Sequence, residues 1–225
     1  MARKRYDPPP ETALLRNRLR EALKTQDDQG RVVSSARHGV YLFYDYDEEP
    51  VYVGQTYERL SSRIGRHLTN QRTDAVAMNV LDPFEVAEIE MWPFFELEDA
   101  PTNVAKDVLN RAEYTVYRRA IDASSHKAIL NEGDIASTEL IELPPSLRLR
   151  VVPDEVFEER KHPDTRIARR ASTIAALARA ISEREVGKGL RRTLLTQARR
   201  LEHLARARLD EADAVIPDQQ SDEEV

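Results

Sequence analysis

The sequence predicts an α+β protein in which short strands alternate with helices and two long helices follow near the C-terminus. Two runs of aromatic and β-branched residues, HGVYLFYDYD and VYVG, flank the acidic turn 47–50 and predict a β-hairpin. A third run, FEVAEIEMW, predicts another strand that ends at Pro93. Outside these runs, apolar residues recur every three or four positions, which is the spacing of amphipathic helices.

Three helices are predicted around these strands. An N-terminal helical extension is expected over residues 1–30, because leucines at helical spacing follow three consecutive prolines. Leu60, Ile64 and Leu68 lie four apart and predict a helix after the hairpin. A longer helix is expected over residues 103–121, where one side carries Val104, Val108, Ala112 and Val116.

The last third of the chain divides into three parts. Residues 136–160 are predicted to be a linker, since the preceding NEG sequence and the pair Pro144-Pro145 are typical of loops. Residues 161–212 contain two strong helical patterns separated by glycines, which predict an αα-hairpin, here called the C-terminal hairpin. The acidic tail, residues 213–225, is predicted to be disordered.

The net charge of −6 conceals a strong internal division. Residues 25–159, here called the acidic body, carry a net charge of −13. Residues 160–208, which span most of the C-terminal hairpin, carry +10. This asymmetry indicates that the hairpin binds either an anionic partner or the acidic body itself.

Length and composition narrow the class of protein. A chain of 225 residues can bury a core without disulfides or structural metals. It has no cysteine, which excludes thiol nucleophiles and cysteine-ligated metal sites. No apolar run approaches the roughly 20 residues of a membrane span, and the basic N-terminus runs into prolines instead of an apolar signal segment. We therefore expect a cytoplasmic protein with no membrane segment.

Candidate chemical groups gather in the predicted hairpin and the helix that follows it. Strand alternation places Tyr41 on the face opposite Val40 and Leu42, and Tyr52 lies in the second strand just before Gly54. A polar row recurs at intervals of four on the following helix: Arg59, Arg63 and His67.

A carboxylate in the next helix completes the set. Glu113 shares a helix face with Leu109, Val116 and Tyr117, and an acid among apolar neighbours needs a cation or metal ion as partner. Taken singly, each of these residues is more often a packing or surface residue. Together, two phenols, a guanidinium row, a histidine and one carboxylate suit the hydrolysis of phosphodiester bonds.

These residues resemble the signature of the GIY-YIG nuclease superfamily. Gly39-Val40-Tyr41 is followed after ten residues by Tyr52-Val53-Gly54, with valine in place of the isoleucine of both triplets. The later elements follow in the family's order over about residues 37–133: Arg63 and His67 four apart, Glu113, and Asn131 in ILNEG. The predicted nuclease-like domain is therefore 37–135.

The resemblance implies a three-stranded antiparallel sheet flanked by helices. It implies a DNA endonuclease in which Glu113 holds one Mg²⁺ (or Mn²⁺), Tyr41 helps to deprotonate the attacking water, and Arg63 stabilises the charged transition state. It assigns His67 to support of the acid–base step and Tyr52 to the positioning of water or phosphate. Gly54, Arg59 and Asn131 are expected to have supporting roles.

Two alternatives stay open at this stage. The first is a binding or regulatory protein that keeps the fold but cuts slowly or not at all. If the protein is an enzyme, restriction-like defence and repair are both plausible settings. RNA is a less favoured substrate than DNA. The second concerns the arginines of the C-terminal hairpin, which either contact nucleic acid or form the polar face of a hairpin docked on the acidic body or across a homodimer. We expect nucleic-acid contacts from Arg169, Arg170, Arg191, Arg192, Arg199 and Arg200.

Overall fold

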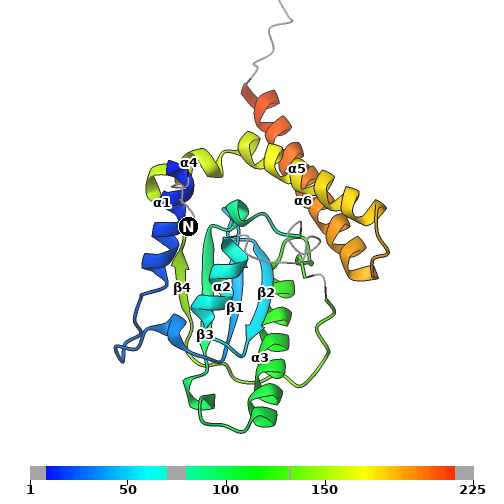
Figure 1. The fold of residues 1–225 in the computed structure, drawn as a ribbon. Helices are drawn as coiled ribbons and strands as arrows, with labels where there is room; N and C mark the ends of the chain where they lie inside the picture. The colour runs from blue at the N-terminus through cyan, green and yellow to red at the C-terminus, as the bar shows by residue number, and fades with distance from the viewer. Residues whose placement is uncertain (1–8, 70–79, 132, 216–225) are drawn as a thin grey trace, which may run out of the picture.

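A computed structural model describes residues 9–69, 80–131 and 133–215 of the chain. An antiparallel sheet with the strand order β2-β1-β3-β4 lies at its centre (Figure 1). Three of these strands were predicted, and the α+β class is confirmed. Their bounds are Gly39–Tyr44 for β1, Pro50–Thr56 for β2, Glu88–Pro93 for β3 and Leu147–Arg150 for β4.

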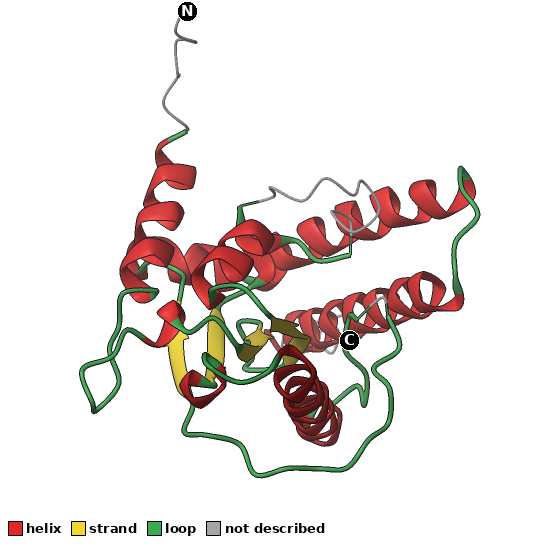
Figure 2. Cartoon of the chain, turned by 60° about the horizontal axis from the view of Figure 1, so that its bottom comes forward, coloured by secondary structure: helices red, strands yellow, loops and turns green. Residues whose placement is uncertain are grey.

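Six α-helices surround the sheet in the described part of the chain (Figures 1 and 2). Helices α2 and α3 and the C-terminal hairpin appear within a few residues of their expected bounds, whereas the helix of the N-terminal extension covers only residues 10–22 of the expected 1–30. The helices are α1 (Pro10–Ala22), α2 (Leu60–Leu68), α3 (Thr102–Ala123), α4 (Asp154–Lys161), α5 (Pro163–Ser182) and α6 (Lys188–Val215). None of them is long and apolar enough to cross a bilayer.

The pairing of β1 with β2 fixes the relative positions of the motif residues. Tyr41 lies opposite Gly54, and Phe43 lies opposite Tyr52, so these four residues share one face of the sheet. The other edge of β1 pairs with β3, so β2 lies at one edge of the sheet and β4 at the other. An outermost strand gives side chains from both faces of the sheet access to one edge.

Each face of the sheet is covered by a different helix. On one face, Tyr41 and Phe43 belong to a buried cluster with Leu60 and Ile64 of α2. On the other face, Val40 and Leu42 belong to a second cluster, together with buried residues of α3: Ala105, Leu109, Ala112, Val116 and Ala120. The alternation of side chains along β1 therefore separates a layer with α2 from a layer with α3, as its sequence predicted.

The predicted linker at 136–160 is wrong as a description of this segment. Residues 147–150 form β4, which pairs antiparallel with β3, and α4 follows at once. The sequence LRLR has the two-residue period of a half-buried strand, and its leucines are half-buried while its arginines are exposed. The pair Pro144-Pro145 marks only the loop that leads into this strand.

The predicted disorder of 213–225 is also partly wrong, because α6 continues to Val215. The remaining residues, 216–225, lie outside the described part of the chain.

Several apolar side chains of the C-terminal hairpin are buried within the chain. Helices α5 and α6 run side by side and are joined by a loop at one end (Figure 2). Leu177 and Ile181 of α5 and Leu204 of α6 are buried. These three side chains are therefore packed inside the chain itself.

Candidate active site

An open pocket of about 690 Å³ lies at the edge of the sheet formed by β2. It brings together residues from both faces of the sheet, since no strand in the described part of the chain pairs with the outer side of β2. The predicted site residues among its walls are Tyr52, Gly54, Arg63, Glu113 and Asn131. Residues up to 79 positions apart in the sequence thus meet at one strand edge.

Tyr41 and His67 form a buried pair next to this pocket. The Tyr41 hydroxyl lies 3.1 Å from His67 Nε2, and both side chains are buried. The rings of Tyr41 and His67 meet edge to face at 5.7 Å between centroids, and Tyr52 lies 5.2 Å from the same histidine ring. The predicted phenols and histidine therefore form one contiguous group on the α2 face.

Gly54 permits the phenol of Tyr41 to reach the pocket wall. A Cβ atom at position 54 would collide with the hydroxyl and ring of Tyr41. The backbone of Gly54 itself lines the pocket. The glycine is therefore required by close approach, because any larger residue would push the phenol away from this edge.

Glu113 reaches the pocket from the α3 face. Its burial raises the pKa of the carboxyl to about 7, although hydrogen bonds from Gln55 and the positive charge of Arg63 act in the opposite direction. The Gln55 side chain donates from Nε2 to Glu113 Oε2 at 3.0 Å. The pocket thus contains a carboxylate that is costly to ionise without a cation.

Sequence reasoning missed Gln55, which donates a hydrogen bond to Glu113, and Asn110, which accepts one from Gln55. Gln55 Nε2 also donates to Asn110 Oδ1 at 2.8 Å, and the Tyr57 hydroxyl donates to Gln55 Oε1 at 3.2 Å. The available signal was strand alternation, because Gln55 follows Gly54 and must point to the face that α3 covers. Asn110 lies three residues before Glu113, on the same side of α3.

Asn131 holds the outer edge of β2. Its side-chain Oδ1 accepts a hydrogen bond from Val53 N at 3.1 Å, and its Nδ2 donates to Val53 O at 2.8 Å. The amide therefore pairs with the strand as a neighbouring strand would. Arg59, in contrast, is exposed at the start of α2, one turn before Arg63.

Part of the chain matches the model of a known family. Residues 37–99 match the family model described as the GIY-YIG catalytic domain. The chain contains a GIY-YIG domain. No curated protein and no solved structure matches the chain significantly.

The matched range of the GIY-YIG domain contains β1, β2, α2 and β3, and so includes Tyr41, Tyr52, Arg63 and His67. The match to this family model supports a nuclease-type function in general. Glu113 and Asn131 lie beyond the matched range, and they join the GIY-YIG domain through contacts with β2.

The donor set of the pocket fits the divalent metal ion that GIY-YIG nucleases generally use. Within the described ranges, no group of three or more histidine, aspartate or glutamate side chains could hold a metal ion by itself. Mg²⁺ is often bound by one or two carboxylates together with waters and substrate phosphates. A single desolvated carboxylate, Glu113, at the wall of an open pocket agrees with that mode of binding.

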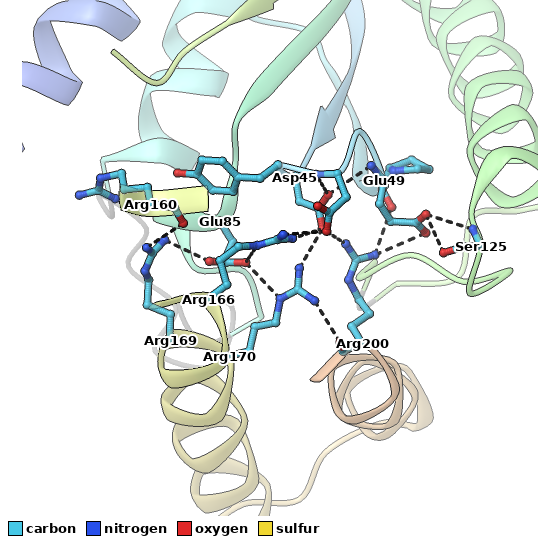
Figure 3. Close-up of polar contacts among 12 residues, drawn as sticks. Asp45, Glu49, Glu85, Ser125, Arg160, Arg166, Arg169, Arg170 and Arg200 are labelled. Atoms are coloured by element: carbon cyan, nitrogen blue, oxygen red, sulfur yellow. Dashed lines mark hydrogen bonds and ion pairs between the residues drawn. The ribbon is translucent and has the colours of Figure 1, made fainter. Parts of the chain in front are cut away.

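The structure corrects the assignment of three hairpin arginines to nucleic-acid binding. Arg170 and Arg200 are buried, and Arg169 is mostly covered; Figure 3 shows their polar contacts. Each of these arginines contacts a carboxylate of the acidic body, either Asp45 or Glu85. These arginines dock the C-terminal hairpin on the acidic body, which was the alternative interpretation of their charge.

Asp45 is the centre of this contact. Its Oδ2 atom accepts hydrogen bonds from Arg200 at 2.7 Å, Arg170 at 2.8 Å and Arg166 at 3.1 Å. Burial by itself would raise the pKa of Asp45, but the three guanidinium groups outweigh that effect and lower it. Glu85 contacts Arg170 at 3.1 Å in the same cluster, and burial raises its pKa despite the arginines.

The remaining predicted arginines have different surroundings. Arg191, Arg192 and Arg199 are exposed on α6. Arg192 forms an ion pair of 2.6 Å with Asp134, which lines the GIY-YIG pocket. The hairpin arginines therefore divide into a buried docking set and an exposed set.

Proposed function

We propose that the protein is a divalent-metal-dependent endonuclease that hydrolyses phosphodiester bonds of DNA. The observation that carries this proposal is the meeting of Glu113 and Arg63 in one open pocket at the edge of β2, with the Tyr41–His67 pair directly behind Gly54. This arrangement offers a metal ligand, a fixed positive charge and a proton-transfer pair within one site.

Tyr41 and His67 are assigned to the removal of a proton from the attacking water. In its neutral form with an unprotonated Nε2 atom, His67 accepts the proton of the Tyr41 hydroxyl across their 3.1 Å contact. The phenol oxygen in turn accepts the proton of the water, so the proton ends on His67. The ordinary pKa of histidine, near 6.5, suits such a transfer at neutral pH.

Arg63 and Glu113 are assigned to the stabilisation of the negative charge on the phosphate, Arg63 directly and Glu113 through a bound metal ion. Arg63 places a guanidinium group at the pocket wall, where it stabilises charge that develops in the transition state. Glu113 would hold Mg²⁺ or Mn²⁺, which when bound acts as a Lewis acid on a phosphate oxygen. Tyr52 forms part of the same wall and positions the water or the phosphate.

The proposal is tested by the cleavage of plasmid DNA in Mg²⁺ or Mn²⁺. We expect wild-type protein to nick or cut the plasmid, and we expect EDTA and Glu113→Gln each to abolish cleavage. Gln has the shape of Glu but is a far weaker metal ligand, so the loss reports on the charge. The matched control is Glu155→Gln on the exposed side of α4, which should cut as wild type does.

The outcomes separate the proposal from its alternatives. Equal cleavage by wild type and Glu113→Gln would assign the activity to a contaminant and contradict the proposed site. Binding of DNA without cleavage in either metal would favour the non-catalytic binding protein. A single-stranded RNA substrate in the same assay tests the remaining alternative, and faster cleavage of RNA than of DNA would overturn the assignment of DNA.

A further inference from the structure

Helix α6 runs from the rim of the candidate active site to the turn between β1 and β2. Near its start, the Thr193 hydroxyl lies 3.4 Å from Asn131 O, beside the pocket. One turn later, Gln197 Nε2 donates to Val80 O at 3.1 Å, and Arg200 reaches the turn at Asp45. Figure 1 shows α6 crossing the end of the sheet near β2 and α3.

The docking contacts of Figure 3 hold α6 in this position. Arg200 and Arg170 are buried against Asp45, and Arg170 also donates to the backbone oxygen of Arg200 at 3.1 Å. Because Arg170 and Arg200 are buried and paired with Asp45, their charges are not available at the outer surface of the hairpin. The same contacts also fix which side of α6 can meet a ligand.

The sides of α6 have different surroundings. One side packs toward α5, where the Arg208 side chain donates to Asp164 at 3.0 Å. The opposite side faces the loop after α3, because Arg192 pairs with Asp134 and the ring of His203 lies 5.3 Å from that of His126. This second side therefore borders the loop 133–138, which lines the active-site pocket.

Basic residues recur along this second side of α6. Their intervals of four, seven and seven keep them in line on a helix with 3.6 residues per turn. All four are exposed: Lys188, Arg192, Arg199 and Arg206. We call these residues the α6 row. Arg192 and Arg199 are separated by about 10 Å along the helix axis, whereas Arg191 points about 100° around the helix from Arg192.

We propose that the α6 row binds the phosphate backbone of the DNA strand that leaves the active-site pocket. The proposal rests on the proposed nuclease function and names the surface that holds its substrate. The acidic body repels a polyanion, so affinity must come from exposed positive charge beside the site. Arg192 would exchange Asp134 for a phosphate, and Arg206 would exchange its ion pair with Glu202 in the same way.

The test is the salt dependence of DNA affinity, measured in EDTA so that no cleavage occurs. A fluorescent duplex is titrated with full-length protein by anisotropy at several salt concentrations. The variant Arg192→Gln/Arg199→Gln removes two charges from the α6 row. The control Arg18→Gln/Arg20→Gln removes two charges from exposed positions on α1, at the opposite edge of the sheet (Figure 1).

Each lost phosphate contact lowers the slope of log affinity against log salt by about 0.9. We expect the α6 row variant to lower the magnitude of the slope by about two units and the α1 control to leave it unchanged. At single positions, Arg192→Gln should lower the slope and Arg191→Gln should not.

Other outcomes overturn the inference in distinguishable ways. If wild type and both double variants show the same slope, or both double variants lose slope equally, the α6 row is not the binding surface. Normal plasmid cleavage by the wild type in Mg²⁺ would then leave the nuclease function standing. If the wild type cuts no DNA and binds none in EDTA, both proposals fail. Circular dichroism of each variant verifies that the substituted helices remain folded.

Discussion

At the scale of single residues, Glu113 shows a conflict between stability and function. Its folded carboxyl has a pKa of about 7 against an ordinary value of 4.5, because the pocket wall withdraws it from water. The folded protein therefore holds this proton more tightly than the unfolded chain does. A group arranged in this way weakens the fold when ionised, and a bound cation would relieve the cost.

This conflict predicts a gain of stability from the inactivating variant Glu113→Gln. As the pH rises from 4.5 to 7, the unfolded wild-type chain releases the proton first, so wild-type stability falls by up to about 3 kcal/mol. Gln carries no such proton, so the variant should equal wild type at pH 4 and exceed it at pH 8 in EDTA. Urea unfolding at both pH values measures the difference.

The exposed control Glu155→Gln should show no pH-dependent difference from wild type. Addition of Mg²⁺ at pH 8 should reduce the advantage of Glu113→Gln, since an ion bound only to the folded wild type stabilises it. A constant difference between Glu113→Gln and wild type from pH 4 to pH 8 would contradict the raised pKa.

At the scale of elements, the outer edge of β2 is held by the segment after α3, through the backbone N–H of Leu130 and the side chain of Asn131. Asn131 pairs with both polar backbone groups of Val53, and the same residue begins the loop that borders α6. These hydrogen bonds of Asn131, here called the clamp, therefore connect the sheet, the pocket and the C-terminal hairpin. An edge strand held in this way stays accessible along the rest of its outer side, where the pocket lies.

The clamp predicts that Asn131→Ala destabilises the protein by about 2 kcal/mol, because two backbone groups of a partly buried strand lose their hydrogen bonds. Asn131→Asp keeps the acceptor for Val53 N but turns a carboxylate oxygen toward Val53 O, so at neutral pH its loss of stability should be at least that of Asn131→Ala. Denaturant unfolding measures both. A loss below about 0.5 kcal/mol for Asn131→Ala would show that the clamp does not hold β2.

At the scale of the whole molecule, opposite charges join two parts that differ strongly in composition. The acidic body supplies Asp45 and Glu85, and the C-terminal hairpin supplies Arg166, Arg170 and Arg200, all of them buried. Removal of the hairpin would leave both carboxylates without these cations in an apolar contact surface. We therefore expect the body alone to fold poorly, and for that reason our experiments use substitutions in the full chain.

This contact predicts a large effect of Asp45→Asn. The substitution leaves three buried guanidinium groups without their shared carboxylate, and loss of one partner from a buried ion pair typically costs about 3–5 kcal/mol. Since the pKa of Asp45 is lowered, its contribution persists at neutral pH and is lost as the pH falls below 3.8. Thermal unfolding of Asp45→Asn at pH 7 tests this, with the exposed Glu202→Gln as a control that should leave the melting temperature unchanged. A melting temperature like that of wild type would show that the cluster contributes little.

Local sequence determined the elements that carry the motif. Alternation along β1 placed Tyr41 on one face and Val40 on the other, and the spacing of Arg63 and His67 placed both on α2, because these periods are intrinsic to strands and helices. Helical periodicity was insufficient for Val104, which fits the spacing of the apolar face but is exposed. Helix α3 turns Ala105 and Leu109 toward the sheet instead.

Only the tertiary structure decided which charged side chains are buried. Arg199 and Arg200 are adjacent and identical in the sequence, yet Arg199 is exposed and Arg200 is buried against Asp45, 155 residues away. Likewise, Gln55 became the partner of Glu113 only when β2 and α3 packed together. Periodicity specifies which face of an element a residue occupies, whereas the surface that covers that face depends on contacts between distant segments, and these form only when the whole chain folds.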